Sequence, residues 1–383
     1  MNKQLRIMRI NYIIILIAFL LLCCGEAAKA PIQKAEGYVP EPEDTVRHIT
    51  LLFAGDLMQH KPQVTAAATA DGYDYTECFR YMKPLIEEAD VAIANLEVTL
   101  AGKPYTGYPT FSAPDDYLKG IVEAGFDVLL TSNNHCLDRG QQGLERTLTV
   151  LDSFDVPHLG TYRDEAERER SYPFLLEKNG FRIALLNFTY DTNGIEVTPP
   201  NVVNYIDTIQ LAKDIYKAHA MRPDAIIACP HWGIEYKQIP SDDQRWLTQW
   251  LLDRGVDHVI GGHPHVLQPM EIHTNNYTLA EHLVVYSMGN YVSNMSAVNT
   301  DGGAQVTLHL SKYAGITKLD SCSYSLFWVS KPKDSGHKNY RVYPVTVSPD
   351  SLNAVEKSLL NRFVTNARQL FNARNVGIKE KSE

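Results

Sequence analysis

Two histidines separated by one proline, His263 and His265, stand in the stretch from Gly261 to Val266. They directly follow an apolar run, so they lie where a buried strand is expected to end and a loop to begin. Glycine permits tight backbone turns and Pro264 holds its φ near about −65°, so the two imidazoles should project in a defined relation. Such a pair indicates a metal site, although a loop with two surface histidines gives the same pattern.

Other expected strands also end in polar residues that could bind a metal. Apolar runs are followed by carboxylates, amides or imidazoles at four further places, where α/β sheets carry their ligand chemistry. Each residue alone has an ordinary alternative, such as a turn cap, a surface carboxylate or a packed aromatic pair. Their joint occurrence at strand ends favours a metal site over these alternatives. The candidates are Asp56, Glu97, Asn134, His135, His231, His263 and His265.

Carboxylates, imidazoles and an amide carbonyl form a mixed oxygen and nitrogen donor set. Such a set suits Zn, Mn, Fe or Ni, and no thiolate is present to demand a softer metal. The candidates are too many for one tetrahedral ion but sufficient for two ions that share a carboxylate. Two ions about 3.5 to 4 Å apart can activate a water molecule and hold a phosphoryl oxygen. We therefore predict two divalent transition-metal ions, Mn, Fe or Zn.

The elements that must position these residues alternate between strands and helices. Apolar runs predict strands over 48–58, 90–97, 126–131, 224–229, 256–260 and 283–290. Helices are expected over 79–89, 115–124, 142–154, 203–219 and 241–255, and a hairpin is expected to turn at Asn179-Gly180. Strands over 305–310, 319–329 and 340–347 and a helix over 352–371 follow. The pattern predicts an α/β domain over 48–298, with 299–383 completing or extending it as antiparallel strands and a terminal helix.

The N-terminal segment has the composition of an export signal. Lys3, Arg6 and Arg9 precede an apolar run that ends at Cys23-Cys24. The run is shorter than the roughly 20 residues of a membrane span. It resembles a bacterial lipoprotein signal over 1–24, with Cys24 as the expected lipidation site and Cys23 as the alternative. An uncleaved anchor and simple secretion also fit. Residues 25–47 read as a flexible tether.

Composition excludes one class of partner. The chain has 383 residues, of which 44% are hydrophobic and 21% charged, as in ordinary globular proteins. Its formal net charge is −9, whereas nucleic-acid affinity depends largely on cationic side chains. We therefore expect no nucleic-acid partner.

The polar strand ends belong to an ordered series of motifs: Gly55-Asp56, Asn95-Leu96-Glu97, Asn134-His135, His231-Trp232-Gly233, Gly262-His263-Pro264-His265 and Ser287-Met288-Gly289-Asn290. This series resembles that of the CapA capsule-synthesis family, which is linked to poly-γ-glutamate production and is similar to calcineurin-like metallophosphatases. The resemblance covers about residues 49 to 295. It implies a four-layer α/β/β/α sandwich with metals at the sheet ends.

The resemblance also implies a role for each motif residue. Asp56 and His265 would bind the first ion, Glu97 would bridge both ions, and His135 would protonate the leaving group. The second ion would be bound by Asn134, His231 and His263. The first metal-binding motif of metallophosphatases is Asp-x-His, but here Met58 stands at the histidine position. His60 could substitute if the strand has ended, and His60, Trp232 and Asn290 are candidates for lining the pocket.

The expected protein is therefore an exported, membrane-anchored lipoprotein of the bacterial cell envelope with a metal-dependent hydrolase site. Its substrate would be an anionic polymer or a small ester, phosphoester or amide, and it could act within a capsule-synthesis membrane complex. The alternative is a non-catalytic surface scaffold that binds or exports an anionic polymer and carries a vestigial metal site. The net charge of −9 gives no general attraction to polyglutamate, so polymer binding would need a local basic patch.

Overall fold

The first strand, β1 (Arg47–Leu57), shows how the sequence divides between two hydrophobic cores. Ile49, Leu51 and Phe53 belong to one core, whereas Leu52 and Ala54 belong to the other. Because successive side chains of a strand point to opposite faces, this strand must be covered on both sides. The computed structural model describes residues 45–381, which lie within one compact unit running from Asp44 to Glu383.

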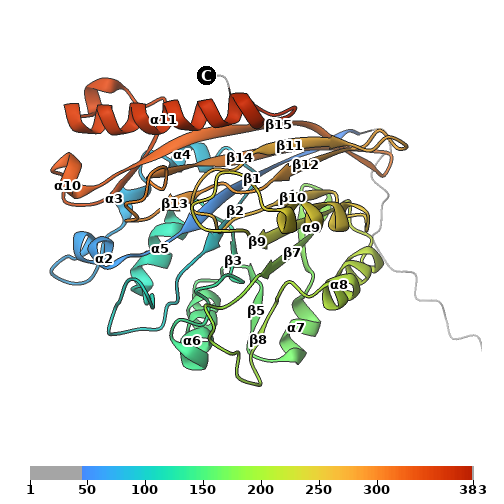
Figure 1. Cartoon of the computed structure of the whole chain (residues 1–383). Coiled ribbons are helices and arrows are strands. Elements are labelled where there is room, and N and C mark those ends of the chain that lie inside the picture. The colour runs from blue at the N-terminus through green and yellow to red at the C-terminus, as the bar shows by residue number, and fades with distance from the viewer. Residues whose placement is uncertain (1–44, 382–383) are drawn as a thin grey trace, which may run out of the picture. The chain divides into compact units, whose positions relative to one another are not determined.

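Two packed sheets form the centre of the described chain (Figure 1). The 9-stranded sheet has the order β16-β15-β14-β1-β2-β3-β4, with β13 paired to β1 and β17 to β15. The 6-stranded sheet has the order β11-β12-β10-β9-β7-β6, and β5 pairs with β8. In the larger sheet the further strands are β2 (Val91–Leu96), β3 (Val128–Leu130), β4 (His158–Leu159), β13 (Asn290–Val292), β14 (Gly302–Tyr313), β15 (Ile316–Ser330), β16 (Arg341–Pro344) and β17 (Lys379–Glu380). The others are β5 (Thr161–Tyr162), β6 (Phe174–Lys178), β7 (Phe181–Thr189), β8 (Val202–Val203), β9 (Ala225–His231), β10 (His258–Ile260), β11 (Met270–Thr274) and β12 (Glu281–Val285).

Helices cover the outer faces of both sheets. Leu118 and Ile121 of α5 (Asp115–Glu123) share a core with one face of the larger sheet. Leu211 of α8 (Thr208–Ala220) and Leu247 of α9 (Asp242–Leu252) pack with the smaller sheet. The expected four-layer α/β/β/α fold is therefore confirmed. The remaining helices are α2 (Lys61–Ala67), α3 (Thr76–Phe79), α4 (Lys83–Ile86), α6 (Gly140–Ser153), α7 (Glu165–Ser171), α10 (Pro332–Ser335) and α11 (Ala354–Arg374).

Strand direction brings the polar strand ends together. β1, β2, β3 and β4 run parallel in the larger sheet, and β7, β9, β10 and β12 run parallel in the smaller sheet. Parallel strands place their carboxyl ends at one edge, which is where α/β folds bind ligands. The C-terminal strands continue the larger sheet, because β14 pairs antiparallel with β1 and β15 pairs antiparallel with β14.

Several predicted elements match the structure and others differ, among them the strand expected over 283–290, which is divided between β12 of the smaller sheet and β13 of the larger one. The hairpin turns at Asn179 and Gly180, whose φ values are 51° and 76°. The helix expected over 79–89 is instead two short helices, α3 and α4, because Pro84 at the start of α4 cannot continue a preceding helix. The helix expected from 203 begins only at Thr208, where the Asp207 side chain accepts the backbone N–H groups of Ile209 and Gln210.

The predicted signal segment 1–24, its Cys24 and nearly all of the tether 25–47 lie outside the described residues. Over 45–381, none of the helices is long and apolar enough to cross a membrane.

Candidate metal centre

The structure brings the seven predicted site residues to one edge between the two sheets. Asp56 lies near the end of β1, and Glu97 directly follows β2. His231 is the last residue of β9, whereas the remaining four residues lie in the loops after β3 and β10. All seven are at most 4% exposed. The loop residues are Asn134, His135, His263 and His265.

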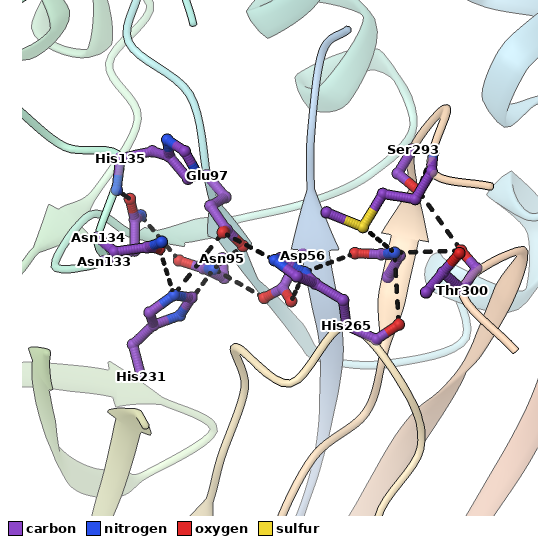
Figure 2. A network of polar contacts seen from close by, with 12 residues as sticks. Asp56, Asn95, Glu97, Asn133, Asn134, His135, His231, His265, Ser293 and Thr300 are labelled. Carbon is purple, nitrogen blue, oxygen red and sulfur yellow. Dashed lines mark hydrogen bonds and ion pairs between the residues drawn. The ribbon is translucent and has the colours of Figure 1, made fainter. Parts of the chain in front are cut away.

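Glu97 lies between the other donors (Figure 2). Its Oε1 is 3.7 Å from Nε2 of His231 and 3.7 Å from Nε2 of His265. Donor atoms of Asp56, Glu97 and His231 all lie within 4.8 Å of one another, and so do those of Glu97, His263 and His265. Glu97 is thus common to both groups, as a bridging carboxylate must be.

The shorter contacts divide the donors into two pairs. Oδ2 of Asp56 lies 3.3 Å from Nδ1 of His265, and Oδ1 of Asn134 lies 2.9 Å from Nε2 of His231. The ring centroid of His263 is 4.8 Å from that of His231 and 5.6 Å from that of His265. The donor atoms of His263 thus lie with those of Glu97 and His265, whereas its ring is nearer to that of His231.

Four buried donor atoms at this site have no hydrogen-bond partner among the described residues. Buried polar atoms are almost always paired, so a group of unpaired atoms at one place points to a ligand. Two are carboxylate oxygens and two are imidazole nitrogens, a donor set that fits Mn, Fe or Zn. The atoms are Oδ2 of Asp56, Oε1 of Glu97, Nδ1 of His263 and Nε2 of His265.

Two asparagines orient the donors. Oδ1 of Asn290 lies 3.0 Å from Nδ1 of His265, so this nitrogen carries the proton and Nε2 is left as the lone-pair donor. The Asn290 amide in turn donates to the carbonyl of Thr300. Asn95 donates through Nδ2 to Oδ1 of Asp56 over 2.8 Å and accepts from Asn133 at its own Oδ1. Metal ligands commonly depend on such outer hydrogen bonds.

Burial determines the protonation of the donors. Burial raises the pKa of Glu97 well above its usual value, and the nearby charge of Asp56 adds to the effect. Burial also acts to raise the pKa of Asp56, but its interactions with His265, His231 and Asn95 together outweigh burial, and the net pKa is lowered. Burial lowers the pKa of His231 to about 3 and that of His263 well below its usual value, so both imidazoles are neutral at neutral pH, the form in which a ring nitrogen can bind a metal.

The backbone around the histidine pair has an unusual conformation. His263 and His265 have φ values of 98° and 58°, which non-glycine residues seldom adopt and which concentrate at functional sites. The preceding Gly261 has no room for a side chain, because a Cβ there would lie 2.3 Å from Nε1 of Trp232. Gly55, before Asp56, similarly lies against the carbonyl of Gly289.

His135 lies beside the donors and contacts a carboxylate of its own. Its Nδ1 is 2.8 Å from Oδ2 of Asp138, which also accepts the backbone N–H of Phe111. The Phe111 ring packs edge-on against the imidazole at 4.6 Å. These contacts fix the ring, as is needed for a group that transfers a proton.

The three predicted pocket residues have different surroundings. His60 caps α2 and contacts Gln63 and the backbone of Asn294, and it is not in either donor group. Burial lowers its pKa to about 4. Trp232 is only 2% exposed and packs in the core, where its Nε1 donates to the carbonyl of Tyr286, so it does not line a pocket. Asn290 contacts His265 as described above.

Two exposed tyrosines beside the donors were not predicted. The Tyr190 ring lies 4.5 Å from that of His263, and the Tyr236 ring lies 6.3 Å from that of His265. They are 41% and 48% exposed, respectively. Both lie in loops that follow strands, and no local sequence signal distinguishes them from other surface tyrosines.

Comparison with known proteins gives matches over most of the chain. The family model of the bacterial capsule synthesis protein PGA_cap matches residues 50–295. The capsule biosynthesis protein CapA of Bacillus anthracis is 28% identical over 329 residues, which are 82% of this chain and 76% of that protein. The PGA biosynthesis protein CapA of Bacillus subtilis (strain 168) is 30% identical over 309 residues, 75% of this chain and 72% of that one. A solved calcineurin-like phosphoesterase of Bacillus subtilis has a TM-score of 0.44 at 15% identity, covering 85% of this chain and 99% of its own.

Proposed function

Because the chain belongs to the bacterial capsule synthesis protein family PGA_cap, we propose that it is an exported, lipid-anchored protein of capsule or poly-γ-glutamate biosynthesis with a dinuclear, metal-dependent hydrolase site. The single observation that carries the catalytic part is the convergence of four unpaired, buried donor atoms around Glu97. The family and the N-terminal sequence support the cellular role.

We divide the donors between two ions. Asp56, through Oδ2, and His265, through Nε2, would hold one ion, because both atoms are buried and unpaired. The other would be held by Asn134, His231 and His263, and Glu97 would bridge the two. Bound ions would supply a water nucleophile at neutral pH and charge stabilisation for a phosphoryl or acyl oxygen.

The chain's own residues would orient the donors and deliver a proton. Asn290 holds His265 with Nε2 free, and Asn95 holds the carboxylate of Asp56. His135, whose Nδ1 contacts Asp138, would protonate the leaving atom of the substrate. General acid catalysis of this kind contributes about 10² to 10⁴ in rate.

The substrate would be met at the rim of the centre rather than within it. The cavity lined by Asp56, His231 and Gly262 has a volume of about 10 Å³, which is room for a water molecule or an ion. Tyr190 and Tyr236 are the partly exposed side chains at that rim. We propose an anionic polymer, or a small ester, phosphoester or amide, as substrate.

A second candidate function is a non-catalytic scaffold for an anionic polymer or for a capsule-synthesis membrane complex. Met58 favours it, because this residue stands where the resembled metallophosphatases carry a ligand histidine and is 0% exposed in the apolar core. His60 does not replace the missing histidine in the donor groups. One of the two proposed metal positions would therefore have fewer protein donors than the other.

One experiment separates the two functions. The full chain is stripped with a chelator, reloaded with Mn²⁺, Fe²⁺ or Zn²⁺, and assayed for metal content and for hydrolysis of phosphodiesters, phosphomonoesters and γ-glutamyl peptides. The hydrolase function predicts turnover that His135→Ala lowers by about 10² to 10⁴ with unchanged metal content. Metal binding without any turnover supports the scaffold, and a chain that binds no metal contradicts both metal assignments.

The proposed anchoring has its own test. Growth of the producing bacterium with radioactive fatty acid should label the protein, and Cys24→Ala should remove the label. Unchanged labelling of this variant would move the site to Cys23. Absence of label from the unaltered chain would contradict lipidation.

A further inference from the structure

A group of exposed apolar side chains lies at the end of the sheets opposite the metal centre. Figure 1 shows the β11–β12 and β14–β15 turns reaching the same side of the molecule, beside the start of β1. Both turns line one cavity of about 520 Å³, which confirms that they are neighbours. We call the group the hairpin-tip surface; it consists of Val46, Tyr277, Leu279, Tyr313 and Ile316, which are 49%, 98%, 75%, 50% and 63% exposed.

The β14–β15 turn holds two of these side chains at its tip. Ala314 and Gly315 form the two-residue loop, with φ values of 49° and 77°. Positive φ at both positions is typical of the tight hairpin turns that fit the twist of paired strands. Tyr313 and Ile316 are the pair that flanks this loop, so they are presented side by side at the end of a rigid ribbon.

The β11–β12 turn is ordered by its own side chains. Oδ1 of Asn275 accepts the backbone N–H groups of Tyr277 and Thr278 at 2.9 Å and 3.0 Å. Leu279 has a φ of 58°, a strained conformation for a branched aliphatic residue that is also left in solvent. An ordered loop that exposes Tyr277 and Leu279 in this way is expected to have a partner.

The chain enters the domain at this same surface. Arg47, the first residue of β1, pairs with Lys312 next to the β14–β15 turn. Between Cys24 and Arg47 lie 22 residues. A tether of that length, of the kind expected from the composition of this segment, has a mean end-to-end distance of about 25 Å, which is shorter than the roughly 50 Å breadth of a domain of this size. An anchor at Cys24 would therefore hold this end of the domain close to the bilayer.

We propose that the hairpin-tip surface rests in the headgroup region of the membrane. The proposal rests on the lipid anchor of the proposed function and adds the orientation of the domain. Tyrosine rings with aliphatic neighbours are favoured at membrane interfaces, where their apolar bodies are buried and their hydroxyls stay hydrated. Lys318, which is exposed next to Ile316, can extend its ammonium to anionic headgroups.

This orientation separates the membrane from the metal centre. Arg47 and Asp56 are nine residues apart on the same strand, so at about 3.3 Å per residue the centre lies about 30 Å from the surface. The metal centre and its rim tyrosines then face away from the bilayer. A polymer substrate is reached from the aqueous side, and lipids are not in contact with the site.

The test uses one added tryptophan as a depth probe in the full, lipidated chain. Tyr277→Trp is compared with Tyr108→Trp. Tyr108 is 75% exposed and lies in the loop that contacts Lys61, beyond the carboxyl end of β1. Both variants are reconstituted into phosphatidylethanolamine and phosphatidylglycerol vesicles with or without brominated acyl chains. The emission of the unaltered chain is subtracted, and vesicle flotation is measured on the same samples.

The proposal predicts flotation of both variants, with loss of the added Tyr277→Trp emission in brominated vesicles and none for Tyr108→Trp. Flotation with equal quenching of both variants, or of neither, overturns the surface and leaves the anchor standing. A Tyr277→Trp emission that shifts only when membrane proteins are added overturns it in favour of a protein partner. A chain that does not float overturns both the anchor and the surface that depends on it.

Discussion

The side-chain oxygen of Asn290 lies 3.0 Å from Nδ1 of His265, and this contact determines which nitrogen of the ring faces Glu97. An amide oxygen can only accept a hydrogen bond, so Nδ1 must carry the proton. Nε2 is then left without a partner among the described residues, 3.7 Å from Oε1 of Glu97. Asn290, in β13, thus orients His265, a candidate metal ligand in the loop after β10.

Asn290→Ala is expected to weaken metal binding although it removes no ligand. Without the amide, the His265 ring can rotate or carry its proton on Nε2, and loss of such an outer partner lowers metal affinity by about 10 to 100-fold. Competition with a fluorescent chelator measures the affinity. Asn366→Ala, which removes a hydrogen bond from α11 to Asn299, is the matched control and should leave the affinity unchanged. Equal affinities for all three proteins would contradict a positioning role.

The two histidines of the Gly262-His263-Pro264-His265 motif should not be equivalent. The His263 ring lies nearer to that of His231, which contacts Asn134 in the position proposed to have more protein donors, whereas His265 would serve the position that lacks the Asp-x-His histidine. His263→Ala is therefore expected to lower metal affinity more than His265→Ala does. Elemental analysis after dialysis against a range of free Mn²⁺ gives both affinities. The reverse order would mean that the two positions are exchanged.

Glu97 is expected to oppose folding when the metal is absent. Its folded-state pKa lies well above the unfolded value, so the metal-free folded chain holds more protons than the unfolded chain. The free energy of unfolding should therefore fall as the pH rises from the unfolded pKa through the folded pKa. Glu97→Gln, which cannot ionise, should flatten this part of the profile and raise the stability of the metal-free chain at neutral pH.

The same variant should lose the stabilisation that metal provides. At a free metal concentration about 1,000 times the dissociation constant, binding stabilises a native chain by about 4 kcal/mol. Urea unfolding with chelator and with metal measures both effects. Glu235→Gln is a control, because this carboxylate is exposed beside the centre. A Glu97→Gln chain that is still stabilised fully by metal would exclude Glu97 as the bridging ligand.

The strand ends could be predicted from the sequence because apolar runs and their polar successors are local signals. Asp56, Glu97 and His231 follow such runs, and parallel pairing then brings their side chains to one edge. The residues that orient the donors could not be assigned in this way. Asn95 and Asn290 stand in the recognised motifs, but their contacts with Asp56 and His265 depend on how the two sheets pack.

Backbone conformation and core packing also could not be predicted from local sequence patterns. Proline at 264 fixes its own φ, yet nothing in the sequence shows that His263 and His265 on either side adopt positive φ. Pro84 is a local signal against one continuous helix over 79–89, because the residue before a proline is disfavoured in a helical conformation. The surroundings of Trp232 depend on Gly261, which approaches its indole from a loop about thirty residues later in the sequence.

A variant of Trp232 can test whether this side chain belongs to the core or lines the pocket. The indole N–H donates to the carbonyl of Tyr286 over 2.9 Å in the core between the sheets. Trp232→Phe leaves a buried acceptor unpaired, which costs about 1 to 3 kcal/mol of folding free energy, and a small void adds to the loss. Metal affinity should stay unchanged, since neither donor group includes this residue. Trp246→Phe, at a side chain that is 57% exposed, should alter neither property. Urea unfolding and chelator competition measure the two quantities, and a Trp232→Phe chain of normal stability with altered substrate affinity would place the residue in the pocket instead.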